Sequence, residues 1–315
     1  MFITFYGVRG SLPTPIDSSA IAGKTKEILK RFSKEKDTSE ENIDTFIKNL
    51  PFYLTHTYGG NTSCVYLNID GKHFVLDAGS GIKKLGVDLI SKKYGDVNEI
   101  NLFSTHTHWD HIQGLPFFVP CYIDNIKVHI YSGKKKIKKL FYDQQHSDYF
   151  PVPFSLWRKK TDFTVFKANS TVTIDGVTVS TMRLHHPGTS YSYKFEYNGK
   201  VIVYATDVEY NERSMNFLKK SVKFFENADI LIFDSQYTAK ESYEKLSWGH
   251  SSMNTAIDIA LKSNSKQLVF FHHEPAYSDE KLHELFMDAC QYRDTISFGK
   301  KLGLYAAYEG LEISL

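Results

Sequence analysis

The sequence has few cysteines and no long apolar run. Its three cysteines, Cys64, Cys121 and Cys290, are odd in number and form no Cys-x-x-Cys pair. This argues against a disulfide framework and favours a reducing compartment. No segment approaches the roughly 18 apolar residues that a membrane-spanning helix needs, and the first residues lack the basic and apolar segments of a secretory signal. These absences predict a cytoplasmic protein that does not contact membranes.

The sequence also has no large excess of basic over acidic residues or of acidic over basic residues. The chain has 38 lysines and arginines against 36 aspartates and glutamates, so its net charge is only +2. No global basic field therefore favours a nucleic-acid partner. With 42% hydrophobic residues among 315, the composition is that of a globular chain with a sizeable core. The absence of a short-period repeat and of a Pro/Gly/Ser-rich linker predicts a single domain over residues 1–315.

Hydrophobic patterning predicts an α/β protein. Strands are predicted at residues 2–6, 64–69, 72–76, 100–104, 126–131, 171–175, 177–184, 191–197, 200–205, 229–233, 267–271 and 302–308. Helices are predicted at residues 82–92, 211–225, 251–263 and 279–292. Hairpins dominate the first half, and strands alternate with helices in the second. We therefore expect two mixed sheets that pack face to face, with helices outside.

Two segments interrupt this pattern and are interpreted as insertions. Residues 14–57 are charged and partly helical, and a second insertion covers about 134–168. The second contains an aromatic stretch with Tyr149 and Phe150. These rings either wall a substrate pocket, where they would stack on a base, or pack within the insertion or a dimer contact.

A lysine-rich run at 134–139 opens the second insertion. Ile137 within the run and Leu140 and Phe141 after it are at helical spacing, so we interpret the lysines as the solvated face of a helix. Attraction of a phosphate group is the functional alternative.

The sharpest feature is a cluster of metal-binding residue types directly after the strand predicted at 100–104. It reads His106-Thr107-His108-Trp109-Asp110-His111. Side chains alternate along an extended chain, so His106 and His108 point to the same side. A following turn brings Asp110 and His111 to a neighbouring point. Four such residues within six positions suit two metal ions a few ångström apart; a polar loop that is rich in histidine by chance is the weaker alternative.

Three later strands also end in metal-binding residue types. The strands at 177–184, 200–205 and 267–271 are followed by His185-His186, Asp207 and His272-His273. The end of a sheet presents such side chains to a common cleft, and one carboxylate can offer an oxygen to each of two cations. Neighbouring side chains in each histidine pair point to opposite faces, so we expect one ligand per pair.

The pattern His106-x-His108-x-Asp110-His111, followed by a later His, Asp and His, resembles the metallo-β-lactamase superfamily. The resemblance covers most of the chain and implies a four-layer αβ/βα sandwich with a dinuclear site at one edge of the two sheets. It implies one metal held by His106, His108 and His186, a second held by Asp110, His111 and His272, and Asp207 as the bridge. Two divalent ions are expected, with Zn²⁺ as the default and Mn²⁺, Fe²⁺ or Co²⁺ as alternatives.

Further motifs resemble the RNase Z and cyclic-nucleotide phosphodiesterase branch. Asp234 ends the strand at 229–233, and His250 precedes the helix at 251–263. In that branch the acidic residue orients a histidine that is not a metal ligand. The resemblance therefore implies that His250, steered by Asp234, protonates the leaving oxygen. A solvent-exposed histidine beside a helix N-terminus is the alternative for His250.

Two more residues are assigned by resemblance. Segments 6–13 and 58–64 resemble the opening of phosphodiesterase-like members, which makes Asn61 a candidate substrate contact. Asp77 resembles the strand-ending Asp-x-Gly of the superfamily, which supports the metal ligands without being one.

The expected function is a dinuclear phosphodiesterase in which a metal-bridging hydroxide attacks phosphorus, and Asp110 counts among its catalytic residues as well as its ligands. Only 21 positions separate His186 from Asp207. This interval is too short for the long substrate-binding segment that tRNA-processing relatives carry between these two ligands. We therefore expect a small phosphodiester, above all a cyclic nucleotide, and no long nucleic acid. A thioester, lactone or amide hydrolase, an RNase Z-type ribonuclease and a non-catalytic binding module are the alternatives. The family also implies a homodimer.

Overall fold

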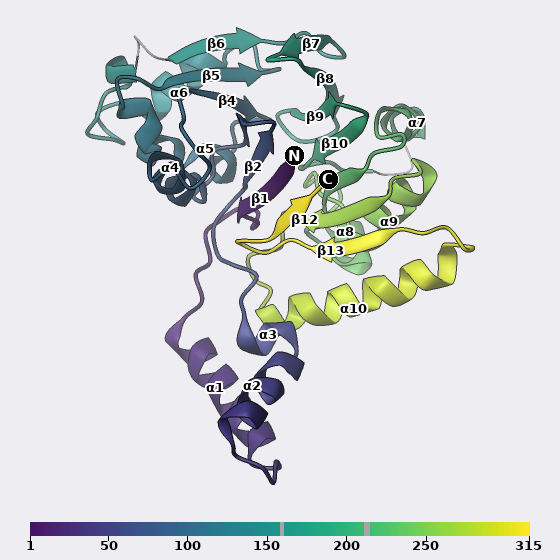
Figure 1. Ribbon diagram of the computed structural model, residues 1–315. Helices are drawn as coiled ribbons and strands as arrows, with labels where there is room; N and C mark the ends of the chain where they lie inside the picture. Colours follow the sequence, from purple (N-terminus) through teal and green to yellow (C-terminus); the bar gives the residue numbers. More distant parts are fainter. Residues whose placement is uncertain (158–160, 211–214) are drawn as a thin grey trace.

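Two mixed β-sheets form the centre of the molecule (Figure 1). The computed structural model describes residues 1–157, 161–210 and 215–315, and within them each sheet has seven strands. The first sheet has the order β14 (Glu312–Ser314), β1 (Phe2–Gly7), β2 (Cys64–Ile69), β3 (Lys72–Leu76), β4 (Glu99–Ser104), β5 (Lys127–Ser132), β6 (Thr161–Val165). The second has the order β13 (Gly303–Ala306), β12 (Gln267–Phe271), β11 (Ile230–Asp234), β10 (Lys200–Ala205), β9 (Ser190–Tyr197), β8 (Val177–Leu184), β7 (Thr171–Ile174).

The two sheets repeat one pairing scheme. The strands from β14 through β1 and β2 to β3 pair antiparallel, and those from β3 to β6 pair parallel. Likewise, β7 to β10 are antiparallel and β10 to β13 are parallel. Three tight hairpins have positive φ at both turn residues, which are Asp70-Gly71, Asp175-Gly176 and Asn198-Gly199. The Asp-Gly and Asn-Gly signals predict these turns correctly, because these residues tolerate left-handed backbone.

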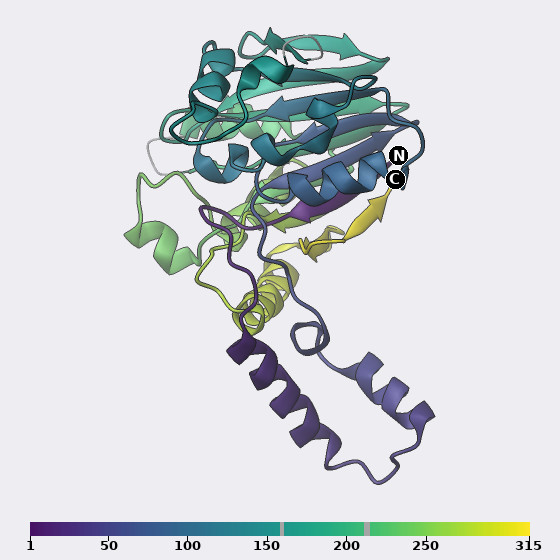
Figure 2. The same cartoon turned by 90° about the vertical axis from the view of Figure 1, so that its left-hand side faces the viewer.

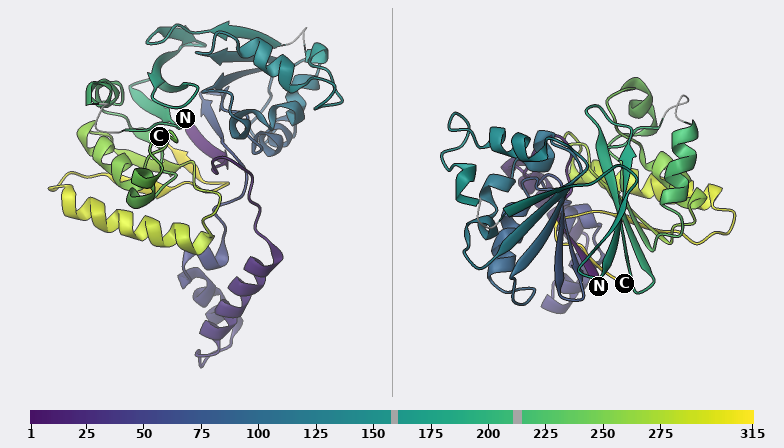
Figure 3. Two further views of the ribbon diagram at one scale, coloured as in Figure 1. Left: turned by 180° about the vertical axis from the view of Figure 1, so that it is seen from behind. Right: turned by 90° about the horizontal axis from the view of Figure 1, so that it is seen from above.

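Helices cover the outer faces of both sheets (Figure 3). The first sheet carries α4 (Ile82–Ile90), α5 (Trp109–Ile112), α6 (Ile137–Gln144) and the 3₁₀ turns η1 (Leu115–Phe117), η2 (Val119–Tyr122) and η3 (Phe154–Trp157). The second carries α7 (Met215–Phe224), α8 (Ala239–Glu244), α9 (Met253–Lys262) and α10 (Asp279–Ile296). Residues 211–214 of the helix predicted at 211–225 lie outside the described residues. No described helix is both long and apolar enough to cross a membrane.

The space between the sheets is filled by aromatic rings. Phe103 of the first sheet lies 5.1 Å from Phe195 and 5.2 Å from Tyr193 of the second, measured between ring centroids. All three side chains are fully buried. Edge-to-face packing of this kind adds to the free energy of burial, and it sets the spacing at which residues from the two sheets meet at the strand ends.

Two short strands escape prediction. β6 lies inside the segment interpreted as an insertion at 134–168, yet it is the edge strand of the first sheet. β14 pairs with β1 at the opposite edge. Both have polar and exposed positions along their length, so they lack the apolar pattern that identifies a strand. The lysine run does lead into a helix, α6, which buries Ile137 and Phe141.

A helical hairpin projects from the body of the molecule (Figure 2). We call the hairpin of α1 (Ser18–Phe32) and α2 (Glu40–Asn49) the arm; the short α3 (Phe52–Thr55) follows it. Phe32 and Phe46 hold the two helices together, with ring centroids 5.1 Å apart. Both helices lie wholly within the described residues, and neither contains a buried residue.

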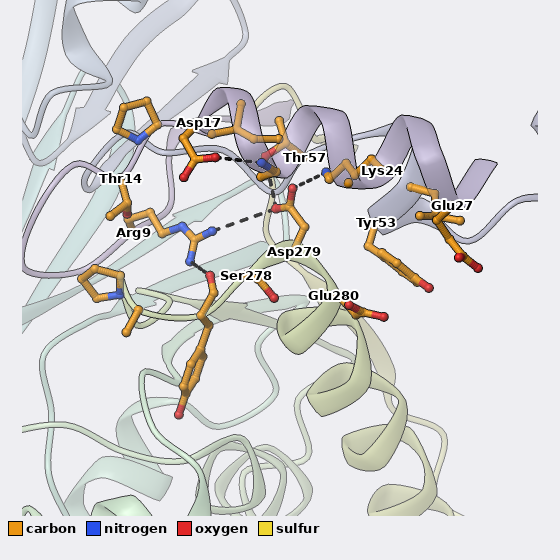
Figure 4. Close-up of a pocket in the computed structure, with 18 residues that line it drawn as sticks. Arg9, Thr14, Asp17, Lys24, Glu27, Tyr53, Thr57, Ser278, Asp279 and Glu280 are labelled. Carbon is orange, nitrogen blue, oxygen red and sulfur yellow. Dashed lines mark hydrogen bonds and ion pairs between the residues drawn. The ribbon is translucent and has the colours of Figure 1, made fainter. Parts of the chain in front are cut away.

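The root of the arm is fixed by a buried carboxylate. Asp279, at the start of α10, accepts hydrogen bonds from the Lys24 ammonium, the Thr57 hydroxyl and the Tyr58 backbone N–H. The guanidinium of Arg9 lies 4.0 Å from the same carboxylate. Figure 4 shows Arg9 and Lys24 converging on Asp279 beside a cavity of about 580 Å³. The arm is thus tied at its base to α10 and to the loop after β1.

Candidate metal centre

Sharp turns at strand ends bring the candidate ligands together. Asp77 and His272 directly follow β3 and β12, and Asp207 lies two residues after β10. Their φ angles are 59°, 65° and 58°, respectively. Left-handed backbone costs a residue with a side chain roughly 1–2 kcal/mol, and such strain persists where the surrounding structure imposes it. The turns redirect the side chains into one space at the same edge of both sheets.

Three histidines and one aspartate form the first candidate site. The candidate donor atoms of His106, His108, His186 and Asp207 all lie within 4.8 Å of one another. The Nε2 of His186 lies 3.1 Å from the Nδ1 of His108 and 3.6 Å from the Oδ1 of Asp207. The Nε2 of His106 also lies 3.6 Å from that oxygen. These are the residues that the resemblance assigns to one metal.

The second candidate site lies on the other side of Asp207. Donor atoms of Asp110, His111 and His272 lie within 4.8 Å of one another. The Oδ2 of Asp110 is 3.2 Å from the Nε2 of His111 and 3.0 Å from the Nε2 of His272. The Oδ2 of Asp207 is 3.1 Å and 3.4 Å from the same two nitrogens. One oxygen of Asp207 therefore faces each site, which is the arrangement of a bridging carboxylate.

The donor set fits a pair of divalent cations. The Nε2 of His106 is fully buried and has no hydrogen-bond partner in the described structure, which is costly unless a ligand occupies it. The Nε2 atoms of His111 and His272 converge to 3.2 Å. Burial lowers the pKa of His106 well below its usual value, so its imidazole is neutral, as metal ligation requires. Imidazole and carboxylate together suit zinc, manganese, iron or cobalt.

Hydrogen bonds on the far side of each ring orient the ligands. The Nδ1 of His111 lies 2.9 Å from the Oδ2 of Asp77, and that of His186 lies 2.9 Å from the carbonyl of Gly249. The Nδ1 of His272 lies 3.0 Å from the Oε1 of Gln236. Each partner can accept the ring proton and leave Nε2 free to bind a metal.

Asp77 joins the two sheets beneath the site. Its carboxylate accepts the backbone N–H and the hydroxyl of Thr105 and the hydroxyl of Tyr204, a residue of the second sheet. As predicted, it supports a ligand and is not one of the clustered donors.

We expect Asp77→Ala to lower the free energy of unfolding by about 3 kcal/mol, because several buried donors lose their acceptor. We expect it also to weaken metal binding by roughly 10–100-fold, because His111 loses its orienting partner. Urea denaturation and titration of the purified protein with Zn²⁺ measure the two effects. Asp288→Ala, which removes an exposed carboxylate of α10, is the control. Unchanged Zn²⁺ affinity in Asp77→Ala would contradict the orienting role.

The structure selects one histidine from each adjacent pair. His186 and His272 lie in the cluster. His185 is exposed, with its ring centroid 6.3 Å from that of Phe217. His273 is buried and bonds to the carbonyl of Ala307 through Nε2.

His250 and Asp234 meet beside the cluster. The Nδ1 of His250 lies 2.8 Å from the Oδ2 of Asp234, and its ring stacks on that of His272 at 5.0 Å. Burial lowers the pKa of His250, but the charge and hydrogen bond of Asp234 outweigh this and raise it to about 9. The imidazole thus holds a proton next to the candidate metal centre. The exposed position considered for His250 is wrong, because only 10% of its side chain is exposed.

No hydrogen bond or ring contact between the predicted substrate contacts and the candidate ligands is described. The amide of Asn61 donates to Glu309 and accepts from the hydroxyl of Ser80, and a substrate role for Asn61 stays a prediction. Tyr149 is 74% exposed. The ring of Phe150 packs 5.3 Å from that of Phe117. A substrate role for these two rings stays a prediction.

Sequence reasoning missed three supports of the site. These are Gln236, which bonds His272; the backbone N–H of Ser11, which bonds Asp110; and Gly10. A Cβ on Gly10 would lie 2.5 Å from the His272 ring, so only glycine fits there. The motif Gly-Val-Arg-Gly-Ser at residues 7–11, which begins at the end of β1, is the sequence feature from which the roles of Gly10 and Ser11 could have been predicted.

Comparison with known proteins decides the family. The model of the beta-lactamase superfamily domain matches residues 73–273, more than half of the chain. The chain belongs to this superfamily. Ribonuclease Z of Picrophilus torridus is 26% identical over 291 residues, covering 76% of this chain and 90% of that protein. Ribonuclease Z of Archaeoglobus fulgidus is 22% identical over 268 residues, covering 70% and 84%. A third, from Prochlorococcus marinus strain NATL1A, is 36% identical over 80 residues, only 25% of this chain and 23% of its own length.

Several solved structures share the fold of this chain. Yeast PDE1 superposes with a TM-score of 0.67 at 14% identity, covering 100% of this chain and 99% of its own. YhfI from Bacillus subtilis gives 0.65 at 16% identity, covering 99% and 98%. The short form of human tRNase Z gives 0.61 at 17% identity, covering 100% and 99%. The predicted αβ/βα sandwich and the predicted membership of the superfamily are confirmed, and this superfamily member is a metal-dependent hydrolase.

Proposed function

We propose that the chain is a dinuclear phosphodiesterase. The observation that carries the proposal is the His250–Asp234 pair, joined at 2.8 Å. A ring nitrogen of His250 also lies within 4.8 Å of donor atoms of Asp207 and His272, two of the seven ligands that the resemblance implies. A protonated imidazole there can give its proton to a leaving alkoxide, which a thioester or lactone hydrolase does not require. When bound, two divalent cations would supply an activated water near neutral pH and neutralise charge on the phosphoryl oxygens.

The residues of the site have separate roles in this proposal. His106, His108 and His186 would hold one cation, and Asp110, His111 and His272 the other, with Asp207 shared. Asp234 orients the His250 ring through Nδ1, which directs Nε2 to the substrate side. Burial of both carboxylates of the cluster opposes their charge, yet the surrounding histidines hold the pKa of Asp110 and of Asp207 well below the usual range. Both are therefore ionised ligands.

Two nucleotide substrates remain in contention. A cyclic nucleotide suits the short interval between His186 and Asp207, and the curated relatives favour an RNase Z-type ribonuclease. A panel of cyclic mononucleotides, cyclic dinucleotides, short RNA and bis(p-nitrophenyl) phosphate, assayed with the Zn²⁺- and Mn²⁺-loaded protein, tests the proposal. We expect turnover of at least one phosphodiester. Turnover of a thioester or lactone with no phosphodiester turnover would overturn it.

We also propose that the arm pairs two copies of the chain. Ile21 and Leu29 of α1 are 52% and 62% exposed, and Ile43 and Ile47 of α2 are 36% and 45% exposed. Helices of this length without a buried side are marginally stable in water. α1 has four basic residues against one acidic, and α2 has three acidic against one basic. Two arms related by a two-fold axis can set each basic helix against an acidic one, which makes a second copy the fitting partner.

Replacing Leu29 and Ile43 together with aspartate is expected to convert a dimer into a monomer, because the apolar faces then carry buried like charges. Analytical ultracentrifugation measures the mass in solution. Phe298→Asp removes an equally apolar but separate residue, 95% exposed beyond α10, and should leave the dimer intact. A monomeric wild-type protein, or a dimer that survives the double replacement, would contradict the arm as the interface.

A further inference from the structure

A basic cavity lies next to the candidate metal centre. It measures about 510 Å³, and its charged lining residues are Lys134, Lys135, Lys167 and Arg183. Among the described residues, no carboxylate lines it. Four cations around one hollow produce a positive potential that attracts anions. We call this hollow the basic cavity.

The basic cavity adjoins the metal ligands through Gly188. A Cβ placed on Gly188 would lie 3.5 Å from the Nε2 of His108 and 4.0 Å from the Nζ of Lys134. Gly188 therefore lies close both to the ammonium group of Lys134 and to the side of the His108 ring that faces away from His186. A ligand that carries two anionic groups close together could place one at Lys134 and the other at the metal centre.

Two of the cations also hold the loop that carries His186. The Lys134 ammonium donates to the carbonyl of Gly188, and the Arg183 guanidinium donates to the hydroxyl of Thr189 at 3.0 Å. Thr189 has a φ of 71°, which is strained for a β-branched residue. Lys135 and Lys167 are exposed, and no hydrogen bond or ion pair of their side chains is described. They are the cations most available to an incoming ligand.

The positive charge extends beyond the basic cavity. Arg183 also lines a neighbouring hollow of about 580 Å³, whose other cations are Lys194, Lys220 and Lys223. Of these, Lys194 has an acidic neighbour, Glu196, at 3.4 Å. A track of cations that leads away from a hydrolytic centre fits a ligand with repeated phosphates better than a single cyclic nucleotide.

We propose that the basic cavity binds a second phosphate of the substrate, and that the substrate is an oligonucleotide whose scissile phosphodiester lies at the metals. This rests on the proposed phosphodiesterase function and selects among its substrates. Lys135 and Lys167 bind the neighbouring phosphate, and Lys134 and Arg183 couple that contact to the loop of His186. A phosphate in the cavity fixes which linkage of the chain reaches the metal centre.

The test measures binding and turnover separately. Fluorescence anisotropy with a labelled single-stranded phosphorothioate oligonucleotide gives the affinity of the metal-loaded full chain at several salt concentrations. We expect Lys135→Glu with Lys167→Glu to weaken binding by about tenfold and to reduce the slope of log affinity against log salt by roughly 0.7 for each phosphate that the protein no longer neutralises. Dinucleotides with and without an added terminal phosphate give kcat and KM. The phosphate should lower KM in the wild type only.

The control is Lys138→Glu, a change of charge in the same lysine run but outside the lining of the cavity. If it weakens binding as much as the two cavity replacements together, or if these leave affinity unchanged, the basic cavity is not a phosphate site. An equal KM for dinucleotides with and without the added phosphate would also overturn the inference. Hydrolysis of bis(p-nitrophenyl) phosphate is followed in parallel, and the absence of hydrolysis of both this diester and the dinucleotides would instead refute the phosphodiesterase function.

Discussion

Replacing His186 with alanine is expected to remove bound metal and to reduce turnover by at least about 100-fold, since loss of even an outer partner of a metal ligand costs roughly 10–100-fold. His186 contributes a buried Nε2 that faces both His108 and the bridging Asp207. Elemental analysis after dialysis, together with bis(p-nitrophenyl) phosphate hydrolysis, measures the two losses.

The adjacent histidine provides a matched control. His185 precedes His186, but its side chain is exposed and outside the cluster. His185→Ala should therefore keep the metal content and the rate of the wild type. Equal losses in His185→Ala and His186→Ala would show that the loop, and not the imidazole of His186, is what matters.

The second large effect is expected at His250, and its size should depend on the leaving group. Proton transfer by a positioned acid contributes roughly 10²–10⁴-fold. An alkoxide released from a nucleotide needs that proton, whereas p-nitrophenolate leaves far more readily without it. We therefore expect His250→Ala to slow a nucleotide substrate by about 10²-fold or more and bis(p-nitrophenyl) phosphate much less.

Asp234→Asn separates positioning from proton donation. The amide keeps the shape of the Asp234 side chain but removes the charge that holds the His250 proton. Its rate with a nucleotide substrate should lie between that of the wild type and that of His250→Ala. Steady-state kinetics with both substrate types and metal analysis of each variant are the measurements. Equal losses on both substrates, or a loss of metal, would assign His250 to structure and not to proton transfer.

A structural feature could be predicted from the sequence when it depends on residues close together in the chain, and could not when it depends on residues far apart. The hairpin turns and the expectation of one ligand in each histidine pair depend on neighbouring residues, so local pattern predicts them. The preference for His186 over His185 comes instead from the resemblance to the superfamily, and the position of His186 in the cluster supports it. The bonds of Gln236 to His272 and of Tyr204 to Asp77 join residues far apart in the chain, and no local pattern encodes them. Asn61 illustrates the limit, because its partner Glu309 comes from the opposite end of the chain.

The candidate ligands come from both halves of the chain, and this has a consequence for biosynthesis. Those from His106 to His111 follow β4 of the first sheet, whereas His186, Asp207 and His272 follow strands of the second. A polypeptide still emerging from the ribosome with only its first half folded holds an incomplete set of donors. It also lacks β14, the C-terminal strand that closes the first sheet against β1. A complete set of candidate ligands therefore requires that both halves of the fold have come together.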